Sequence, residues 1–356
     1  MFLMYAALFA LVVISVRLTT HGEFDPFDRY QTTSIKGLFI GMVFVTHIAD
    51  YVPPEAILSP GWMNAAFRFV RGHFGQLIVV MFLFYSGYGV MTAIMQKGRD
   101  YVRTMPTRRI FITLLNFDVA VLLFIVVDLV LGVDLSLKRG LLALTGWTSV
   151  GNSNWYIFVI VLCYAIAWLG GVFSRRPLLP IIGLSLILAV VLSLVKESWW
   201  YDTLLAFPFG CFVAVHRKRT LEILRRFYLP ALFFIVCSFS LLYLLRIKWR
   251  VLPGLTHNML SILFCLFVVV LSVKVKVGGT VLHWMGERLF PIYVYQRIPM
   301  LILSSFWGGV FSSELWPVCV LLCVVMTFVI AWAYPLWQIR YSGKDCLMGK
   351  RQGISI

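Results

Sequence analysis

The chain has 356 residues, of which 61% are hydrophobic and 13% are charged, and its mean hydropathy is +0.90. This composition excludes a soluble protein, and repeated apolar runs of about 20 residues are typical of transmembrane helices. The net charge of +16 does not indicate nucleic-acid binding, because the basic residues lie in short loops between the apolar runs. We therefore predict an all-α, polytopic transmembrane helical bundle in a lipid bilayer, with no nucleic acid as a partner.

The apolar runs predict about eleven spans, at 1–16, 36–51, 75–95, 110–131, 154–173, 178–195, 203–215, 228–245, 257–273, 285–304 and 316–337. The first run is expected to be a retained helix, because no basic residue precedes it and no cleavage site is evident. The expected divisions are an extra N-terminal helix with its connector (1–33), a membrane domain (34–337) and a basic cytoplasmic tail (338–356).

The distribution of basic residues between loops predicts the topology. Alternate loops are rich in Lys and Arg, and the positive-inside rule makes these loops cytoplasmic. The N-terminus is then outside and the C-terminus is in the cytoplasm. The group Arg246, Lys248 and Arg250 does not fit this pattern, because it falls on the outer side. The seven cysteines show no CxxC pair or Cys/His metal spacing, so we expect neither a disulfide framework nor a metal.

The 36–51 run is apolar enough to span a membrane, yet it contains Lys36, His47 and Asp50. Ionisable groups inside a bilayer are costly and are therefore candidates for functional sites. Lys36 and His47 are about three helical turns apart, so they share one helix face at a separation of about 16 Å along the axis. Asp50 can reach the same face. The pattern favours an anionic cosubstrate that is held at Lys36 and reacts at His47. The structural alternative is that His47 bonds a neighbouring helix and Lys36 extends to the membrane surface.

Two further spans contain polar groups. Residues 82–89 include Ser86 and Tyr88 among glycines, which indicates either close helix packing or the floor of a cavity that holds a substrate carbonyl. Asp118 lies well inside the 110–131 span and is expected to face the bundle interior. There it pairs with an arginine of the preceding loop, orients His47 or is protonated, and the sequence leaves these three choices open.

The start of the 154–173 span groups two amides with two aromatic rings, namely Asn152, Asn154, Trp155 and Tyr156. Such groups are typical of helix caps and membrane interfaces, but they also suit a sugar. Later in the chain, Gln296 and Arg297 are expected to be buried in the 285–304 span. The guanidinium of Arg297 then needs an anion or a carboxylate partner.

These residues together resemble the acyltransferase 3 family, the membrane-embedded bacterial O-acyltransferases that modify surface polysaccharides. Lys36 and His47, with ten residues between them, resemble the basic-x10-His motif of that family. Residues 82–88 resemble its FFxxSGY segment, residues 103–110 its basic cytoplasmic loop, and residues 286–295 its late aromatic segment. The resemblance extends over about residues 34–337 and includes the ten-helix core of the family, to which residues 1–16 are an addition.

Two departures from the family pattern are visible. The family commonly has a paired RxxR in the basic loop, but Pro106 stands three residues before Arg109, so Arg103 or Arg108 is expected to substitute. Gln296 stands in place of a late histidine, so His47 is expected to carry proton transfer without that second imidazole.

The resemblance implies transfer of an acyl group, with acetyl from acetyl-CoA preferred, to a hydroxyl of a cell-surface glycan or its lipid-linked precursor. The enzyme would reside in the bacterial cytoplasmic membrane. Coenzyme A is a polyanion, and the basic residues expected to bind its phosphates are Lys36, Arg103, Arg108 and Arg109. His47 is expected to act as general base or as acyl-accepting nucleophile.

The remaining roles are assigned to neighbouring polar residues. Asp50 or Asp118 would hold the tautomer of His47, and Ser86 and Tyr88 would stabilise the oxyanion. The expected contacts of the glycan acceptor are Asn152, Asn154, Trp155, Tyr156, Gln296 and Arg297.

Two other classes of function stay open at this point. The first is a transporter or flippase for a glycan or lipid-linked intermediate, with His47 and Asp118 in a proton relay. The second is a non-catalytic membrane partner of a polysaccharide synthase, in which His47 is freely replaceable. Dependence on coenzyme A distinguishes the enzyme from the transporter.

Overall fold

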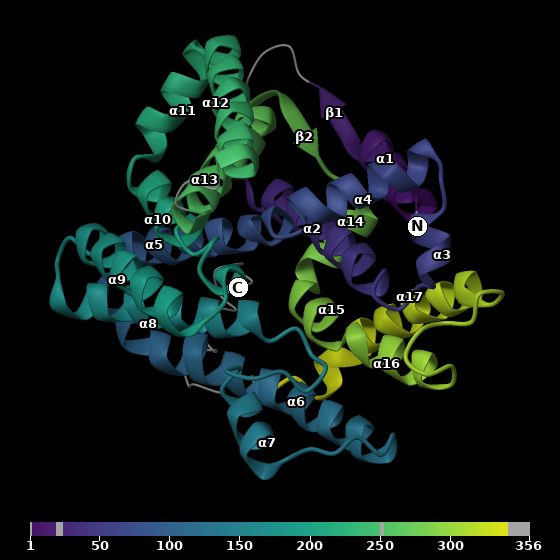
Figure 1. The fold of residues 1–356 in the computed structure, drawn as a ribbon. Helices are drawn as coiled ribbons and strands as arrows, with labels where there is room; N and C mark the ends of the chain where they lie inside the picture. Colours follow the sequence, from purple (N-terminus) through teal and green to yellow (C-terminus); the bar gives the residue numbers. More distant parts are fainter. Residues whose placement is uncertain (1, 19–23, 250–252, 341–356) are drawn as a thin grey trace.

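The computed structural model describes residues 2–18, 24–249 and 253–340, and Figure 1 shows that helices form nearly all of it. The elements of the first half are α1 (Phe2–Ser15), β1 (Val16–Leu18), α2 (Arg29–Ile48), α3 (Pro54–Leu58), α4 (Trp62–Phe74), α5 (Leu77–Met105), the π-helix η1 (Pro106–Phe111), α6 (Ile112–Val130), α7 (Leu137–Leu144) and α8 (Trp155–Phe173). The elements of the second half are α9 (Leu178–Val195), η2 (Ser198–Trp200), α10 (Ala206–Val215), α11 (Arg217–Arg226), α12 (Tyr228–Trp249), α13 (Pro253–Lys274), β2 (Val275–Val277), α14 (Thr280–Glu287), α15 (Leu289–Tyr295), α16 (Arg297–Ser305), α17 (Trp316–Ala333) and η3 (Tyr334–Leu336).

The expectation of an all-α polytopic protein is confirmed. Within the described ranges, six stretches are long and apolar enough to cross a membrane: Leu77–Val130, Trp155–Phe173, Leu178–Val195, Tyr228–Lys248, Pro253–Lys274 and Trp316–Leu336. The total of eleven spans stays a prediction. One feature was not expected: β1 and β2 form a short antiparallel pair that joins the end of α1 to the end of α13.

Helix α2 lies in the middle of the bundle, beside α5, α14 and α15 (Figure 1). Glycines bring its backbone into direct contact with α14. A Cβ atom on Gly37 would collide with the carbonyl oxygen of Leu282, and one on Gly286 would collide with the carbonyl oxygen of Thr33. Small residues permit this approach in membrane bundles, where close packing replaces the hydrophobic driving force between helices. The glycine contacts therefore fix α2 against α14.

Helix α5 is fixed against α10 in the same way. Gly87 faces the carbonyl oxygen of Phe207, and Gly210 faces that of Phe84. Gly87 of the glycine-containing segment 82–89 therefore serves close helix packing. Along the chain, α5 bends at Gly98, whose φ of 57° favours glycine, and the π-helix η1 then carries the chain into α6.

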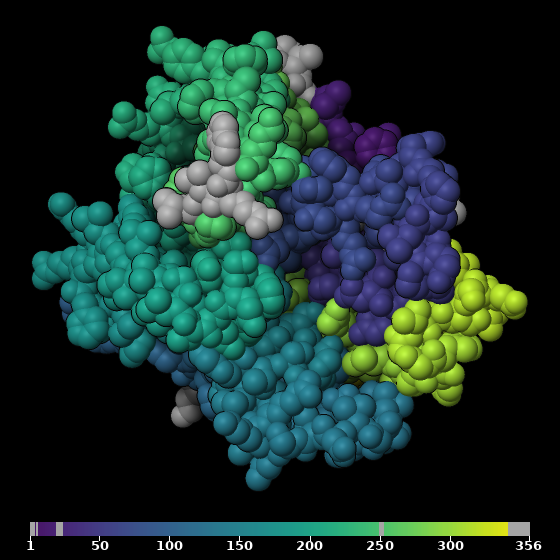
Figure 2. Space-filling view, in the orientation of Figure 1, coloured from purple at the N-terminus to yellow at the C-terminus, as the bar shows by residue number. Residues whose placement is uncertain are grey.

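Three segments differ from the sequence expectation. Residues 62–74, expected as a loop, form α4, whose apolar face packs on α12 through Phe74 and Phe239, with ring centroids 6.2 Å apart. Figure 2 shows this blue segment against the green helices. The basic stretch 217–226 is also a helix, α11. The single expected span 285–304 is divided into short helices at Arg288 and Gln296. Arg250 and most of the expected basic tail, residues 341–356, lie outside the described residues.

Candidate active site

Two cavities lie along α2, one beside each ionisable residue of the predicted motif. The Lys36 cavity has a volume of about 180 Å³ and is lined by Lys36, Tyr85, Ser86, Gly89, Val90, Arg109 and Tyr164. The His47 cavity has a volume of about 430 Å³, and its charged and imidazole groups are His47, Arg71, His73, Asp202, Arg246 and His257. One helix thus presents a lysine to one cavity and a histidine to the other.

The Lys36 cavity has the chemistry of an anion site. Lys36 comes from α2, and Arg109 comes from η1, where its Nε donates a hydrogen bond of 3.2 Å to the hydroxyl of Tyr101. The other polar groups are hydroxyls, and none of the residues found to line this cavity is a carboxylate. Arg103 is exposed on α5 and does not line the cavity, and neither does the half-buried Arg108. The structure therefore brings Lys36 together with one of the three predicted arginines.

His47 lies in the last turn of α2, where its Nδ1 atom is buried without a hydrogen-bond partner. The predicted partner Asp50 is occupied elsewhere. Its Oδ1 atom accepts from Arg71, and its Oδ2 atom lies 2.7 Å from Nη2 of Arg297. The expected carboxylate partner of Arg297 is thus Asp50. Asp118 lines neither cavity, and its Oδ1 atom is also buried without a partner. Neither predicted carboxylate is hydrogen-bonded to Nδ1 of His47.

Two tyrosines lie between the cavities. Tyr156 shares a side-chain hydrogen bond with Ser86 of the Lys36 cavity, and its ring packs against Tyr293 with centroids 5.2 Å apart. Tyr293 lines the His47 cavity, 6.3 Å from the ring of His47. These contacts connect the lining of one cavity to that of the other through Tyr156 and Tyr293, which we call the wall. The other predicted oxyanion group, Tyr88, lies outside both cavities and stacks on Phe27 at 4.4 Å.

The predicted acceptor residues divide into two groups. Trp155 lines the His47 cavity. The amides serve the local fold instead: Asn152 Oδ1 accepts from the backbone N–H of Val150 at 3.1 Å, and Asn154 Nδ2 donates to the carbonyl of Gly146 at 2.7 Å. Gln296 is fully buried at the break between α15 and α16, where its Nε2 donates to the carbonyl of Tyr293 at 3.1 Å.

Five of the six charged and imidazole groups of the His47 cavity were missed by sequence reasoning, namely Arg71, His73, Asp202, Arg246 and His257. His257 lies near the start of α13 and faces Asp202, which belongs to the connection before α10, with Nδ1 and Oδ2 separated by 3.5 Å. Burial raises the pKa of Asp202 to about 6, against the opposing effects of Arg246 and the hydroxyl of Ser198. Two signals were available. His257 stood at the edge of a predicted span, and Arg246 belonged to the basic group that broke the topology pattern.

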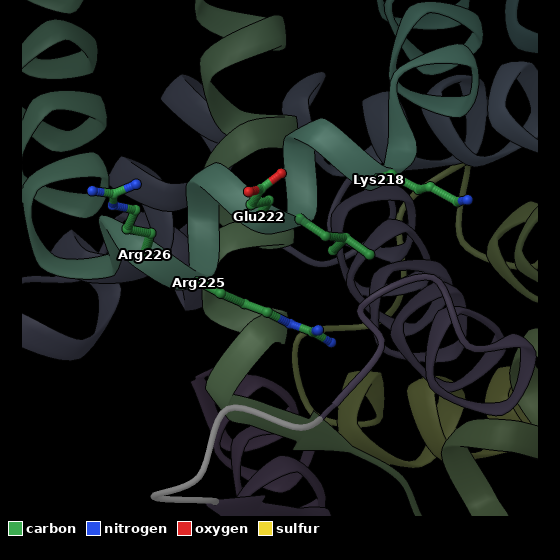
Figure 3. A pocket seen from close by; sticks show the side chains of 5 residues that line it. Lys218, Glu222, Arg225 and Arg226 are labelled. Atoms are coloured by element: carbon green, nitrogen blue, oxygen red, sulfur yellow. The ribbon is translucent and has the colours of Figure 1, made fainter.

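A further hollow, about 600 Å³ in volume, runs along α11 and is lined by Lys218, Leu221, Glu222, Arg225 and Arg226. Figure 3 shows that its charged side chains point in different directions and not toward a common point. This arrangement is that of a basic surface helix, so we do not place the reaction here.

Comparison with known proteins tests the predicted family. A family model described as an acyltransferase domain, that of acyltransferase 3, matches residues 31–335. No match was found among curated proteins or among solved structures. The match covers α2 to η3, and with them both cavities and the Lys36–His47 motif. The chain therefore belongs to the acyltransferase 3 family and is a membrane acyltransferase.

Proposed function

We propose that this protein moves acetyl from acetyl-CoA to a hydroxyl of a cell-surface or exported polysaccharide, or of its lipid-linked precursor. The observation that carries the proposal is the division of α2 between two cavities. Lys36 and Arg109 border one, His47 borders the other, and the packed rings of Tyr156 and Tyr293 connect their linings. A donor with a polyanionic head and a reactive thioester at the end of a long arm matches this arrangement.

The donor head belongs in the Lys36 cavity. Arg109 can bind a phosphate with two parallel hydrogen bonds, and Lys36 adds a mobile positive charge. The charge pattern of the loops supports entry of this head from the cytoplasm, with the N-terminus outside, in the cytoplasmic membrane of a bacterium. The basic helix α11 supports the same orientation, because Arg217 at its start pairs with Asp25 just before α2.

The acyl group then reaches His47, which takes part in one of two ways. As a base, His47 removes the proton of the acceptor hydroxyl, whose oxygen attacks the thioester carbon. The carbon–sulfur bond then breaks, and coenzyme A leaves with the proton from His47. As a nucleophile, it takes the acyl group from sulfur and passes it to the acceptor in a second step. The acceptor belongs in the His47 cavity, where Trp155 offers an aromatic face to a sugar ring.

Radiolabelled acetyl transfer from acetyl-CoA into glycan in inverted membrane vesicles tests this proposal. His47→Ala is expected to lose about 100-fold or more of the transfer. The matched control is His216→Ala, because His216 lies between α10 and α11, outside both cavities. Label in glycan with the natural protein and the control, but not with His47→Ala, supports the proposal. Undiminished labelling with His47→Ala contradicts it.

The transporter alternative would couple His47 to Asp118. Asp118 belongs to α6 and lines neither cavity, so a relay between the two residues has no support from the described contacts. Glycan movement that proceeds without coenzyme A would favour the transporter.

A further inference from the structure

The His47 cavity contains three imidazoles, those of His47, His73 and His257, and that of His257 is paired with a carboxylate. His257 Nδ1 lies 3.5 Å from Asp202 Oδ2, and the two side chains are only 3% and 4% exposed. Both residues line the same cavity as His47. The same cavity therefore contains His47, whose Nδ1 atom has no carboxylate partner, and His257, whose Nδ1 atom lies near the carboxylate of Asp202.

The local fold holds this pair in place. Asn258, which follows His257, donates from Nδ2 to the carbonyl of Tyr201 at 2.9 Å, and its Oδ1 accepts from the backbone N–H of Leu205 at 3.0 Å. These two bonds fasten the turn that carries Asp202 to the first turn of α13. The position of the carboxylate relative to His257 is thus set by the neighbouring residue.

The pair is not satisfied within the protein. Neither nitrogen of His257 has a hydrogen-bond partner, and Asp202 Oδ1 has none either. Buried polar groups of a purely structural pair are normally hydrogen-bonded. Separations above 3.2 Å between catalytic groups often shorten only when substrate is bound. These unpaired polar atoms belong to two residues that line the cavity, so they fit a group that works on a ligand.

The charges around the two histidines differ. His47 lies among cations, since Arg71 and Arg297 gather around Asp50 beside it. A positive charge on His47 would be repelled by both guanidinium groups. His257 has Asp202 on one ring nitrogen, and a carboxylate there stabilises an imidazolium. Arg246 also borders this part of the cavity, where its charge favours the carboxylate of Asp202 and opposes a positive charge on His257.

We propose that His257, positioned by Asp202, is the base that takes the proton of the acceptor hydroxyl, whereas His47 acts on the acyl donor. This inference rests on the proposed acetyl transfer. The hydroxyl proton passes to Nε2 of His257, and the oxygen forms a bond to the acyl carbon. The bond from that carbon to the coenzyme A sulfur, or to His47 if an acyl-histidine forms, breaks. The leaving group then takes the proton from His257.

The test measures transfer of radiolabelled acetyl from acetyl-CoA into glycan in membranes, together with the Kd for coenzyme A. His257→Gln is expected to lower transfer about 100-fold or more, as the loss of a general base does. Asp202→Asn is expected to lower it about tenfold or more, and Asp202→Glu to restore part of the loss. Binding of coenzyme A stays close to that of the natural protein, because both residues lie in the other cavity. Imidazole added to His257→Ala is expected to restore transfer.

The matched control is the pair His283 and Glu287 on α14, which has a similar separation of 3.6 Å but lines neither cavity. His283→Gln is expected to keep full transfer. Full transfer by His257→Gln overturns the inference while leaving the acyltransferase intact. If His257→Gln loses coenzyme A binding through misfolding, the nearly isosteric Asp202→Asn decides, and full transfer by that variant overturns the inference. A natural protein that transfers no acetyl overturns the proposed function itself.

Discussion

The two cavities along α2 differ in how their charges are balanced. The Lys36 cavity has two cations, three hydroxyl groups and no carboxylate among its lining residues, so an anion must come from outside. The His47 cavity opposes Arg246 with Asp202, and Asp50 at its edge neutralises Arg71. The first is suited to holding a polyanion, and the second is suited to moving a proton on an uncharged sugar. On the proposed function, binding of the donor and chemistry are separated along one helix.

After the losses expected at His47 and His257, the largest effect that sharpens this comparison is expected at the Lys36 cavity. Replacing Lys36 or Arg109 by Met removes a charge-assisted contact to phosphate, which is worth about 1.5–3 kcal/mol, and should lower kcat/KM about 10- to 100-fold. The loss should appear mainly as a higher KM for acetyl-CoA. Steady-state kinetics of acetyl transfer measure the split.

Arg103→Met serves as the control, because Arg103 is exposed and lines neither cavity. Its kinetics should match those of the natural protein. A reduced kcat with unchanged KM in Lys36→Met would break the division between the cavities.

The second effect is a dependence on pH that originates in the His47 cavity. The pKa of Asp202 is raised to about 6 by burial, and the groups that face it are Ser198, Arg246 and His257. Below that pH the carboxyl is protonated and no longer supports a positive charge on His257. Transfer should therefore fall as the pH drops through 6, by about tenfold per unit.

Rate measurements at saturating acetyl-CoA between pH 5 and pH 8 check this decrease in transfer at acid pH. The rate of transfer by Asp202→Asn should be low and should not fall further at acid pH, because asparagine does not titrate. If the rate of Asp202→Asn fell in the same way below pH 6, the titration would belong to another group.

The smallest effect concerns the wall between the cavities. Ser86→Ala and Tyr156→Phe each remove one partner of a hydrogen bond worth about 0.5–1.5 kcal/mol. A looser wall should admit water to the thioester, so the ratio of released acetate to transferred acetyl should rise a few-fold. Product analysis with labelled acetyl-CoA measures this ratio. An unchanged ratio in both variants would show that the wall does not exclude water.

Much of this arrangement could be predicted from the sequence, because it depends on local periodicity. The spacing of Lys36 and His47 predicted that one helix carries both, as α2 does, and the apolar runs indicated the helical class. Arg297 was correctly expected to need a carboxylate. The partner, Asp50, could not be identified, because 247 residues separate the two and only the fold brings them together.

Other parts of the site depend on long-range packing, which a single sequence does not encode visibly. Asp202 and His257 meet because Asn258 fastens one segment to another. Ser86 and Tyr88 looked equivalent in the sequence, yet they face different surroundings, since successive helical positions point about 100° apart. Arg246 was counted among the loop charges that predict the topology, but in the structure it lines the His47 cavity.

The glycine contacts of α2 with α14 have a consequence for donor selection. These backbone contacts hold α2 against α14. The distance of about 16 Å along the helix axis between Lys36 and His47 is therefore constant. On the proposed function, a donor whose phosphates are bound at Lys36 must have an arm long enough to place its thioester at His47. If the arm of the donor were shorter, the acyl group would not reach His47, even when the phosphates of the donor were bound. The length of the donor, and not only its charge, then decides which molecules the enzyme accepts.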